Sequence, residues 1–201
     1  FTVATFEEHI STILSLNATT GGSVGLYAEI KSPAWHREQG VDISKAVLNT
    51  LREHQLDDPK ANIFIQCFDF SEIKRLREEL GAEVKLIQLL AENSWNETPT
   101  NYDKLKTQEG IEELSRYVQG IGPWLGHVTR YEGGKPTTEL TPWIETAKQQ
   151  GLLIHPYTYR TDALPPGISA DQLLMLIIKK WQFDGLFTDQ VPPVKRFLQS
   201  Q

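Results

Sequence analysis

Short apolar runs with strand character alternate along the chain with longer segments of helical periodicity. This alternation is typical of βα units whose strands form a largely parallel sheet. The strands are predicted at residues 24–30, 63–68, 84–89, 120–122, 152–158 and 185–188. The helices are predicted at residues 5–16, 43–54, 71–80, 110–118, 142–150 and 170–180. Because no linker or low-complexity stretch divides the chain, we expect residues 1–201 to form a single domain.

Several predicted helices carry signals for their first or last residue. Glu8 follows Thr5 by three positions, which predicts a capping box. Asp69 stands before the third predicted helix and Gly81 follows it, as expected for an N-cap and a C-terminal stop.

The spacing of the strands leaves two architectures open. The first predicted strand begins near Val24 and the last near Gly185, which gives about 32 residues per βα unit. Eight such units need roughly 260 residues, close to the ~250 of a (β/α)₈ barrel. The chain supplies six units and a leading helix, so it is either an open six-stranded sheet or a barrel that lacks about two units at its N-terminus.

Composition excludes several classes of protein. The 26 acidic and 20 basic residues give a net charge of −6, which argues against a nucleic-acid-binding domain. A single cysteine, Cys67, excludes an intrachain disulfide and a multi-cysteine metal site. The longest apolar run, near residues 173–178, is far shorter than the ~20 residues of a membrane span. The chain opens at Phe1 without a Met or signal-peptide features, so we expect that it was cut from a longer protein.

The first predicted strand places two charged side chains together. Tyr27, Glu29 and Lys31 alternate with apolar residues, so they share one face near the strand's C-terminal end. In a barrel these ends build the active site, where a carboxylate and an ammonium could hold a divalent cation and a phosphate oxygen. The alternative is an ion pair that fills the barrel interior.

Other candidate residues each have a functional and a structural interpretation. Tyr157 could stack on a small polyol or pack in the core, and His155 could carry protons or be a hydrogen-bonded core residue. Gln66 could hydrogen-bond a ligand inside the barrel or satisfy a buried neighbour, whereas Asp189 is more typical of a cap or turn. Asn96-Glu97-Thr98 matches the glycosylation sequon.

Five segments in order resemble the glycerophosphodiester phosphodiesterase family, most closely its periplasmic, glycerol-metabolism branch. The segments are Tyr27-Ala28-Glu29-Ile30-Lys31, Phe64-Ile65-Gln66-Cys67-Phe68, Gly120-Ile121-Gly122-Pro123, His155-Pro156-Tyr157-Thr158 and Gly185-Leu186-Phe187-Thr188-Asp189. They keep the family's order and spacing across essentially the whole chain.

The resemblance implies a TIM (β/α)₈ barrel of the PLC-like phosphodiesterase type. It implies metal-dependent hydrolysis of glycerophosphodiesters to sn-glycerol 3-phosphate and an alcohol such as choline or ethanolamine, with Ca²⁺ favoured over Mg²⁺, in the periplasm or another extracytoplasmic site. Glu29 matches a metal carboxylate, Lys31 matches the lysine that contacts the phosphate, and Tyr157 falls where many members place an aromatic ring against the glycerol. His155 is not one of the family's acid/base histidines.

This chain departs from the family pattern at its start. The family's His-Arg-Gly strand, its Glu-x-Asp strand and its His-Asp pair do not occur in this sequence. We therefore expect about the first two βα units, and with them the acid/base histidines, to be absent, and these 201 residues to be inactive alone. An open barrel would expose edge strands at 24–30 and 185–188, which favours self-association.

Two alternatives to this enzyme stay open. One is a non-catalytic truncated barrel that acts as a binding module through its open edge. The other is a phospholipase D-like relative that acts on lipid phosphodiesters.

Overall fold

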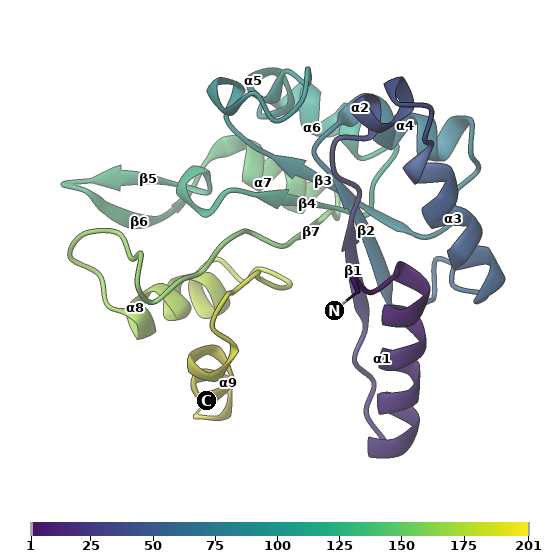
Figure 1. Ribbon diagram of the computed structural model, residues 1–201. Coiled ribbons are helices and arrows are strands. Elements are labelled where there is room, and N and C mark those ends of the chain that lie inside the picture. Colours follow the sequence, from purple (N-terminus) through teal and green to yellow (C-terminus); the bar gives the residue numbers. More distant parts are fainter. Residues whose placement is uncertain (1, 201) are drawn as a thin grey trace. The chain divides into compact units, whose positions relative to one another are not determined.

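The computed structural model describes residues 2–200, which form two compact units (Figure 1). The first unit holds the described residues up to Gln88 together with Glu97–Thr100, and the second holds Leu89–Asn96 and the described residues from Asn101 onward. Both units combine helices with parallel strands, so the α/β class is confirmed. The single domain stays a prediction.

The first unit is built on three strands that run parallel. The strands are β1 (Leu26–Glu29), β2 (Ile63–Cys67) and β3 (Lys85–Leu90), and the last two residues of β3 belong to the second unit. In their register, Glu29 lies opposite Gln66, and Gln66 lies opposite Ile87. The helices are α1 (Phe6–Thr20), α2 (Pro33–Glu38), α3 (Ile43–Glu53) and α4 (Phe70–Glu78).

The two faces of β2 have different roles. Ile63, Ile65 and Cys67 are completely buried, and α4 packs against this strand. Phe64 and Gln66 lie on the opposite face because side chains alternate along a strand. On that face the ring of Phe64 stacks on Tyr27 of β1 with 5.0 Å between ring centroids. Glu29 is therefore on the same face as an aromatic pair, away from the apolar core.

The predicted helix signals are confirmed where the structure describes them. Thr5 accepts a hydrogen bond from the Glu8 amide and its own amide donates to the Glu8 carboxylate, which completes the capping box. Asp69 caps α4 by accepting from the amides of the first turn. Gly81 has a φ of 63°, a left-handed conformation that glycine adopts at little cost.

The second unit contains a parallel pair and a hairpin. Strands β4 (Gly120–Pro123) and β7 (Leu153–Ile154) are parallel, and β5 (Thr129–Glu132) and β6 (Lys135–Leu140) form an antiparallel hairpin. The helices are α5 (Tyr102–Leu105), α6 (Gln108–Leu114), α7 (Pro142–Gln149), α8 (Ala170–Leu174) and α9 (Val191–Gln199). A π-helix, η3 (Met175–Lys180), continues α8, and two 3₁₀ turns are η1 (Asn93–Trp95) and η2 (Leu125–His127).

One predicted strand is wrong and another is shorter than expected. The strand predicted at 152–158 is regular only at Leu153–Ile154, and the strand predicted at 185–188 is reduced to a single bridge between Thr188 and Tyr159. The Phe187 amide donates to the Pro156 carbonyl and the Phe187 carbonyl accepts from the Tyr159 amide. Two residues, 157 and 158, lie between these two hydrogen bonds, whereas a regular parallel pairing has one residue there. This extra residue resembles a β-bulge and interrupts the regular strand pairing.

None of the helices that the structure describes has both the length and the apolar character needed to cross a membrane.

Candidate functional site

Glu29 and Lys31 lie together at the end of β1. Glu29 is the last residue of the strand, and the Lys31 Nζ atom lies 3.4 Å from Glu29 Oε1. The lysine side chain is 71% exposed, whereas that of Glu29 is 25% exposed. The ammonium can therefore move into solvent or toward a ligand, while the carboxylate stays at the sheet.

A small cavity of about 40 Å³ adjoins this pair. It is lined by Glu29, Ile30, Lys31, Ser32, Pro33, Cys67, Phe68, Glu97 and Thr98. Glu97 and Thr98 come from the segment after β3, and the Thr98 hydroxyl donates to the Phe68 carbonyl at 3.5 Å. The sequence marked Asn96-Glu97-Thr98 only as a sequon, so the second carboxylate of this cavity was missed.

Two side-chain oxygens on this face of the sheet have no hydrogen bond. Glu29 Oε1 and Gln66 Oε1 are both buried, and neither accepts a hydrogen bond from a described residue. The contact of Glu29 with Lys31 is an ion pair that lacks hydrogen-bond geometry. An unpaired buried acceptor is costly, so these oxygens favour a ligand that brings positive charge or donors.

Cys67 lines the cavity but is not a nucleophile. Its thiol donates to the Ile30 carbonyl at 3.2 Å, and burial raises the pKa of Cys67 to about 12. Since the thiolate is the reactive form, a cysteine of this kind is inert at neutral pH. This excludes covalent catalysis through Cys67.

A buried charge network fixes the segment that follows Lys31. Arg37 of α2 and Arg75 of α4 both pair with Glu72, which is completely buried, and Arg75 also pairs with Asp42 at the start of α3. The hydrogen bond from Arg75 lowers the pKa of Asp42. Helices α2, α3 and α4 are thus connected by charge-assisted hydrogen bonds, and the first residue of α2, Pro33, lines the cavity.

Tyr157 belongs to the second unit, whereas Glu29 and Lys31 belong to the first. The Tyr157 hydroxyl donates to the Leu90 carbonyl at 2.9 Å, and its backbone amide donates to the Pro123 carbonyl at 3.0 Å. The hydroxyl thus already donates within the protein.

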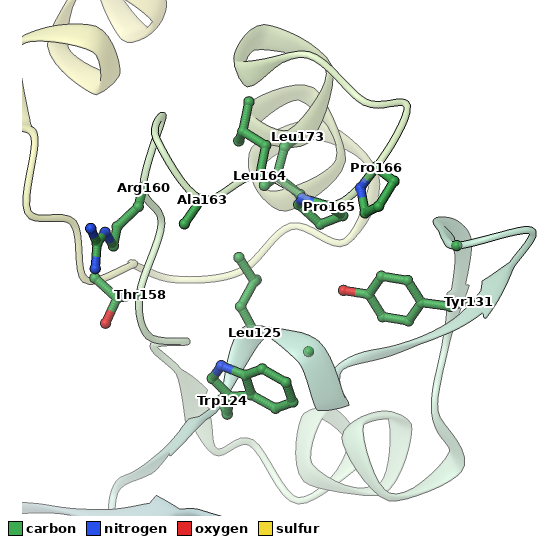
Figure 2. A pocket seen from close by; sticks show the side chains of 12 residues that line it. Trp124, Leu125, Tyr131, Thr158, Arg160, Ala163, Leu164, Pro165, Pro166 and Leu173 are labelled. Carbon is green, nitrogen blue, oxygen red and sulfur yellow. The ribbon is translucent and has the colours of Figure 1, made fainter.

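The residue after Tyr157, Thr158, lines a pocket of about 450 Å³ in the second unit. Figure 2 shows Thr158 and Arg160 on one side of this pocket and Tyr131 of the hairpin on the other. Its other labelled side chains are mainly apolar: Trp124, Leu125, Ala163, Leu164, Pro165, Pro166 and Leu173. The pocket suits a ligand with apolar surface. One of its lining residues, Thr158, directly follows Tyr157, the residue predicted to contact glycerol.

The histidines of the second unit are held in structural contacts. His155 is buried, and burial lowers its pKa. His127 is hydrogen-bonded through Nε2 to Glu92, and burial lowers the pKa of His127 as well. Asp189 is exposed and lies 3.6 Å from Arg160 Nε, in keeping with a turn residue. These observations suit the structural interpretations of His155 and Asp189.

The described residues fit part of a metal site. Within residues 2–200, no three His, Cys, Asp or Glu side chains form a group that could hold a metal ion. Glu29 nevertheless offers a buried carboxylate oxygen that accepts no hydrogen bond, which is a good ligand for Ca²⁺ or Mg²⁺. A complete Ca²⁺ site gathers about 6 to 8 oxygens, so Glu29 would be one ligand among several.

Comparison with known proteins decides the family. The sequence profile of the glycerophosphoryl diester phosphodiesterase family matches residues 1–192. The chain belongs to this family. Resemblance of the five sequence segments to glycerophosphodiester phosphodiesterases is thereby confirmed.

Curated relatives in this family are similar over nearly the whole chain. A glycerophosphodiester phosphodiesterase of Haemophilus influenzae is 34% identical over 205 residues, covering 94% of this chain and 56% of the relative. One from Treponema pallidum is 29% identical over 205 residues, covering 94% of this chain and 58% of the relative. The chain thus spans somewhat more than half the length of these relatives.

A solved structure shows the same fold. The crystal structure of a protein from Silicibacter pomeroyi, assigned to the glycerophosphoryl diester phosphodiesterases, matches with a TM-score of 0.63. The sequences are 18% identical, and the match covers 95% of this chain and 56% of the other.

Proposed function

We propose that the complete protein hydrolyses glycerophosphodiesters to sn-glycerol 3-phosphate and an alcohol. The observation that carries this proposal is the Glu29 carboxylate, whose buried Oε1 atom accepts no hydrogen bond and lies in an ion pair with Lys31, in a chain of this family. The exposed ammonium of Lys31 is consistent with a small-molecule substrate that carries a phosphate.

A phosphodiester monoanion resists hydrolysis for two reasons. Its negative charge repels the attacking oxygen, and the departing alkoxide is a poor leaving group. Lys31 would lower the first barrier, because its exposed ammonium could donate to a phosphate oxygen. Glu29 would hold a divalent cation, Ca²⁺ in preference to Mg²⁺, which supplies Lewis-acid charge when bound.

We further propose that residues outside these 201 supply the acid/base histidines and complete a (β/α)₈ barrel. Within the described chain, the residues that line the Glu29 cavity include no histidine, and His155 is buried. The proposed histidines would take a proton from the attacking oxygen and return one to the leaving alcohol. The 201-residue chain alone would then be inactive.

The direct test is release of glycerol 3-phosphate from glycerophosphocholine by the full-length protein, with Ca²⁺, with Mg²⁺ and with EDTA. We expect metal-dependent turnover that falls at least about 100-fold in Glu29→Gln and in Lys31→Met, because each substitution removes charge at the phosphate. Glu53→Gln, which changes an exposed glutamate of α3, is the matched control and should keep full activity.

Each part of the proposal has its own refuting result. Full turnover in EDTA would refute the metal, and full activity of Glu29→Gln would refute the role of this carboxylate. Turnover by the 201-residue chain alone would refute the claim that the histidines come from elsewhere.

Two further proposals concern the setting of the enzyme. We propose an extracytoplasmic location, supported by the resemblance to the periplasmic branch and tested by cell fractionation. We also propose that the isolated 201-residue chain self-associates through β1, an edge strand whose only described neighbour is β2. A monodisperse monomer in sedimentation would refute this second proposal.

A further inference from the structure

Gln66 lies beside Glu29 and shares its environment. The two residues are register partners in the parallel pair β1 and β2, so their side chains leave the sheet on the same face. Gln66 is only 8% exposed, and its Oε1 atom is buried without a hydrogen bond, as is Glu29 Oε1. Two buried acceptors that receive no hydrogen bond therefore occupy adjoining positions.

The neighbouring strands explain why Gln66 Oε1 has no donor. On one side lies the carboxylate of Glu29, which accepts hydrogen bonds but has none to give when ionised. On the other side lies Ile87 of β3, which is apolar and completely buried. Because nearly all buried acceptors in proteins have a partner, this position is suited to an external positive charge.

We propose that the Gln66 amide oxygen is a second ligand, beside the Glu29 carboxylate, for the divalent cation. This inference deepens the proposed function and rests on it. Hard cations such as Ca²⁺ bind the carbonyl oxygens of glutamine together with carboxylates. A neutral oxygen adds a ligand without adding negative charge, which matters where a phosphodiester anion must approach.

A competing role would use the other end of the amide. If Nε2 donated to Glu29, Gln66 would hold the carboxylate in place without touching the cation. The two roles predict opposite effects when the amide is removed. Loss of a ligand weakens cation binding, whereas loss of a donor frees a carboxylate lone pair and leaves cation binding equal or tighter.

The experiment measures Ca²⁺ affinity by isothermal titration calorimetry on full-length protein freed of metal. Gln66→Met keeps the length of the side chain and removes the amide, and we expect Ca²⁺ to bind roughly 10-fold more weakly. Gln88→Met is the matched control. Gln88 is also a buried glutamine, but it pairs in register with Cys67 and so lies on the opposite face, where its Nε2 donates to the Phe68 carbonyl.

A second variant covers the case in which Gln66→Met does not fold. Gln66→Glu keeps an oxygen at the position and adds charge, so Ca²⁺ should bind more tightly than to the wild type. Equal or tighter binding by Gln66→Met overturns the proposal, and so does unchanged or weaker binding by Gln66→Glu.

The design also separates this inference from the proposed function. Wild-type protein that hydrolyses glycerophosphocholine and binds Ca²⁺, with Gln66→Met binding just as well, refutes the inference alone. Wild-type protein that binds no Ca²⁺ refutes the metal role of Glu29, and the inference with it.

Discussion

Glu72 offers the sharpest test of what stabilises the first unit. It is completely buried and accepts hydrogen bonds from two guanidinium groups, Arg37 of α2 and Arg75 of α4. Glu72→Gln keeps the shape but removes the charge that both arginines share. Breaking a buried ion pair in this way costs about 3 to 5 kcal/mol. Arg75 retains Asp42 and Arg37 is one-third exposed, so we expect the lower end, about 3 kcal/mol.

The assay is urea unfolding followed by circular dichroism. With a denaturant slope of about 2 kcal/mol/M, a loss of about 3 kcal/mol lowers the midpoint by roughly 1.5 M. Glu79→Gln is the matched control, because Glu79 pairs with the same Arg75 at 3.5 Å but is 70% exposed. An exposed pair contributes at most about 1 kcal/mol. If the two variants unfold at the same urea concentration, the network does not stabilise the unit as argued.

Three further predictions concern single residues. Cys67, with its pKa raised to about 12 by burial, should react with a disulfide reagent at pH 8 at least about 100-fold more slowly in the native protein than in urea, and rapid native labelling would contradict this. Gly185→Ala places a Cβ 3.0 Å from His155 Cδ2, so thermal unfolding should show a loss of about 1 to 3 kcal/mol; an unchanged melting temperature would argue against the close packing. Arg75 lowers the pKa of Asp42 in the folded state. The ionised Asp42 therefore stabilises the folded state above about pH 4, and this stabilisation is lost as the pH falls through the folded pKa. Asp42→Asn keeps an N-cap acceptor but loses the ion pair with Arg75. The variant should therefore be less stable than the wild type at pH 6 but closer to it at pH 3. A difference in stability that stays constant with pH would exclude the ion pair as the cause.

Local signals predicted most of the regular elements correctly. The capping box of Thr5 and Glu8 and the cap at Asp69 are set by residues within one turn of the helix start, which sequence reasoning can see. The hairpin of β5 and β6 was missed although Gly133 and Gly134, both at positive φ, stand between its strands. Two such glycines between strand-like runs are a hairpin signal.

The failed strand at 185–188 has a cause that lies elsewhere in the sequence. Its partner segment departs from regular spacing between Pro156 and Tyr159, so apolar character at 185–188 could not reveal that the ladder is interrupted. Tertiary pairing overrides local strand propensity in such cases.

The candidate site was predictable only where its residues share one strand. Glu29 and Lys31 are two positions apart on β1, so alternation was enough to bring them together. Glu97 and Thr98 line the same cavity from a loop nearly 70 positions after Glu29. The hydrophobic pattern of the sequence cannot predict a contact between segments so far apart. Gln66 was a candidate from the start, but its absent donor follows from the register of three strands.

The strand that carries Glu29, β1, is an edge strand of the described sheet. In the part of the chain that the structure describes, β1 pairs with β2 alone, so one row of its backbone amides has no strand partner. Local opening of such a strand costs less free energy than opening of a central one. A cation that binds only the closed strand stabilises it by RT ln(1 + [L]/Kd). Amide hydrogen exchange along β1 should therefore slow by the factor 1 + [L]/Kd, which makes the backbone of this strand a reporter of its own binding equilibrium.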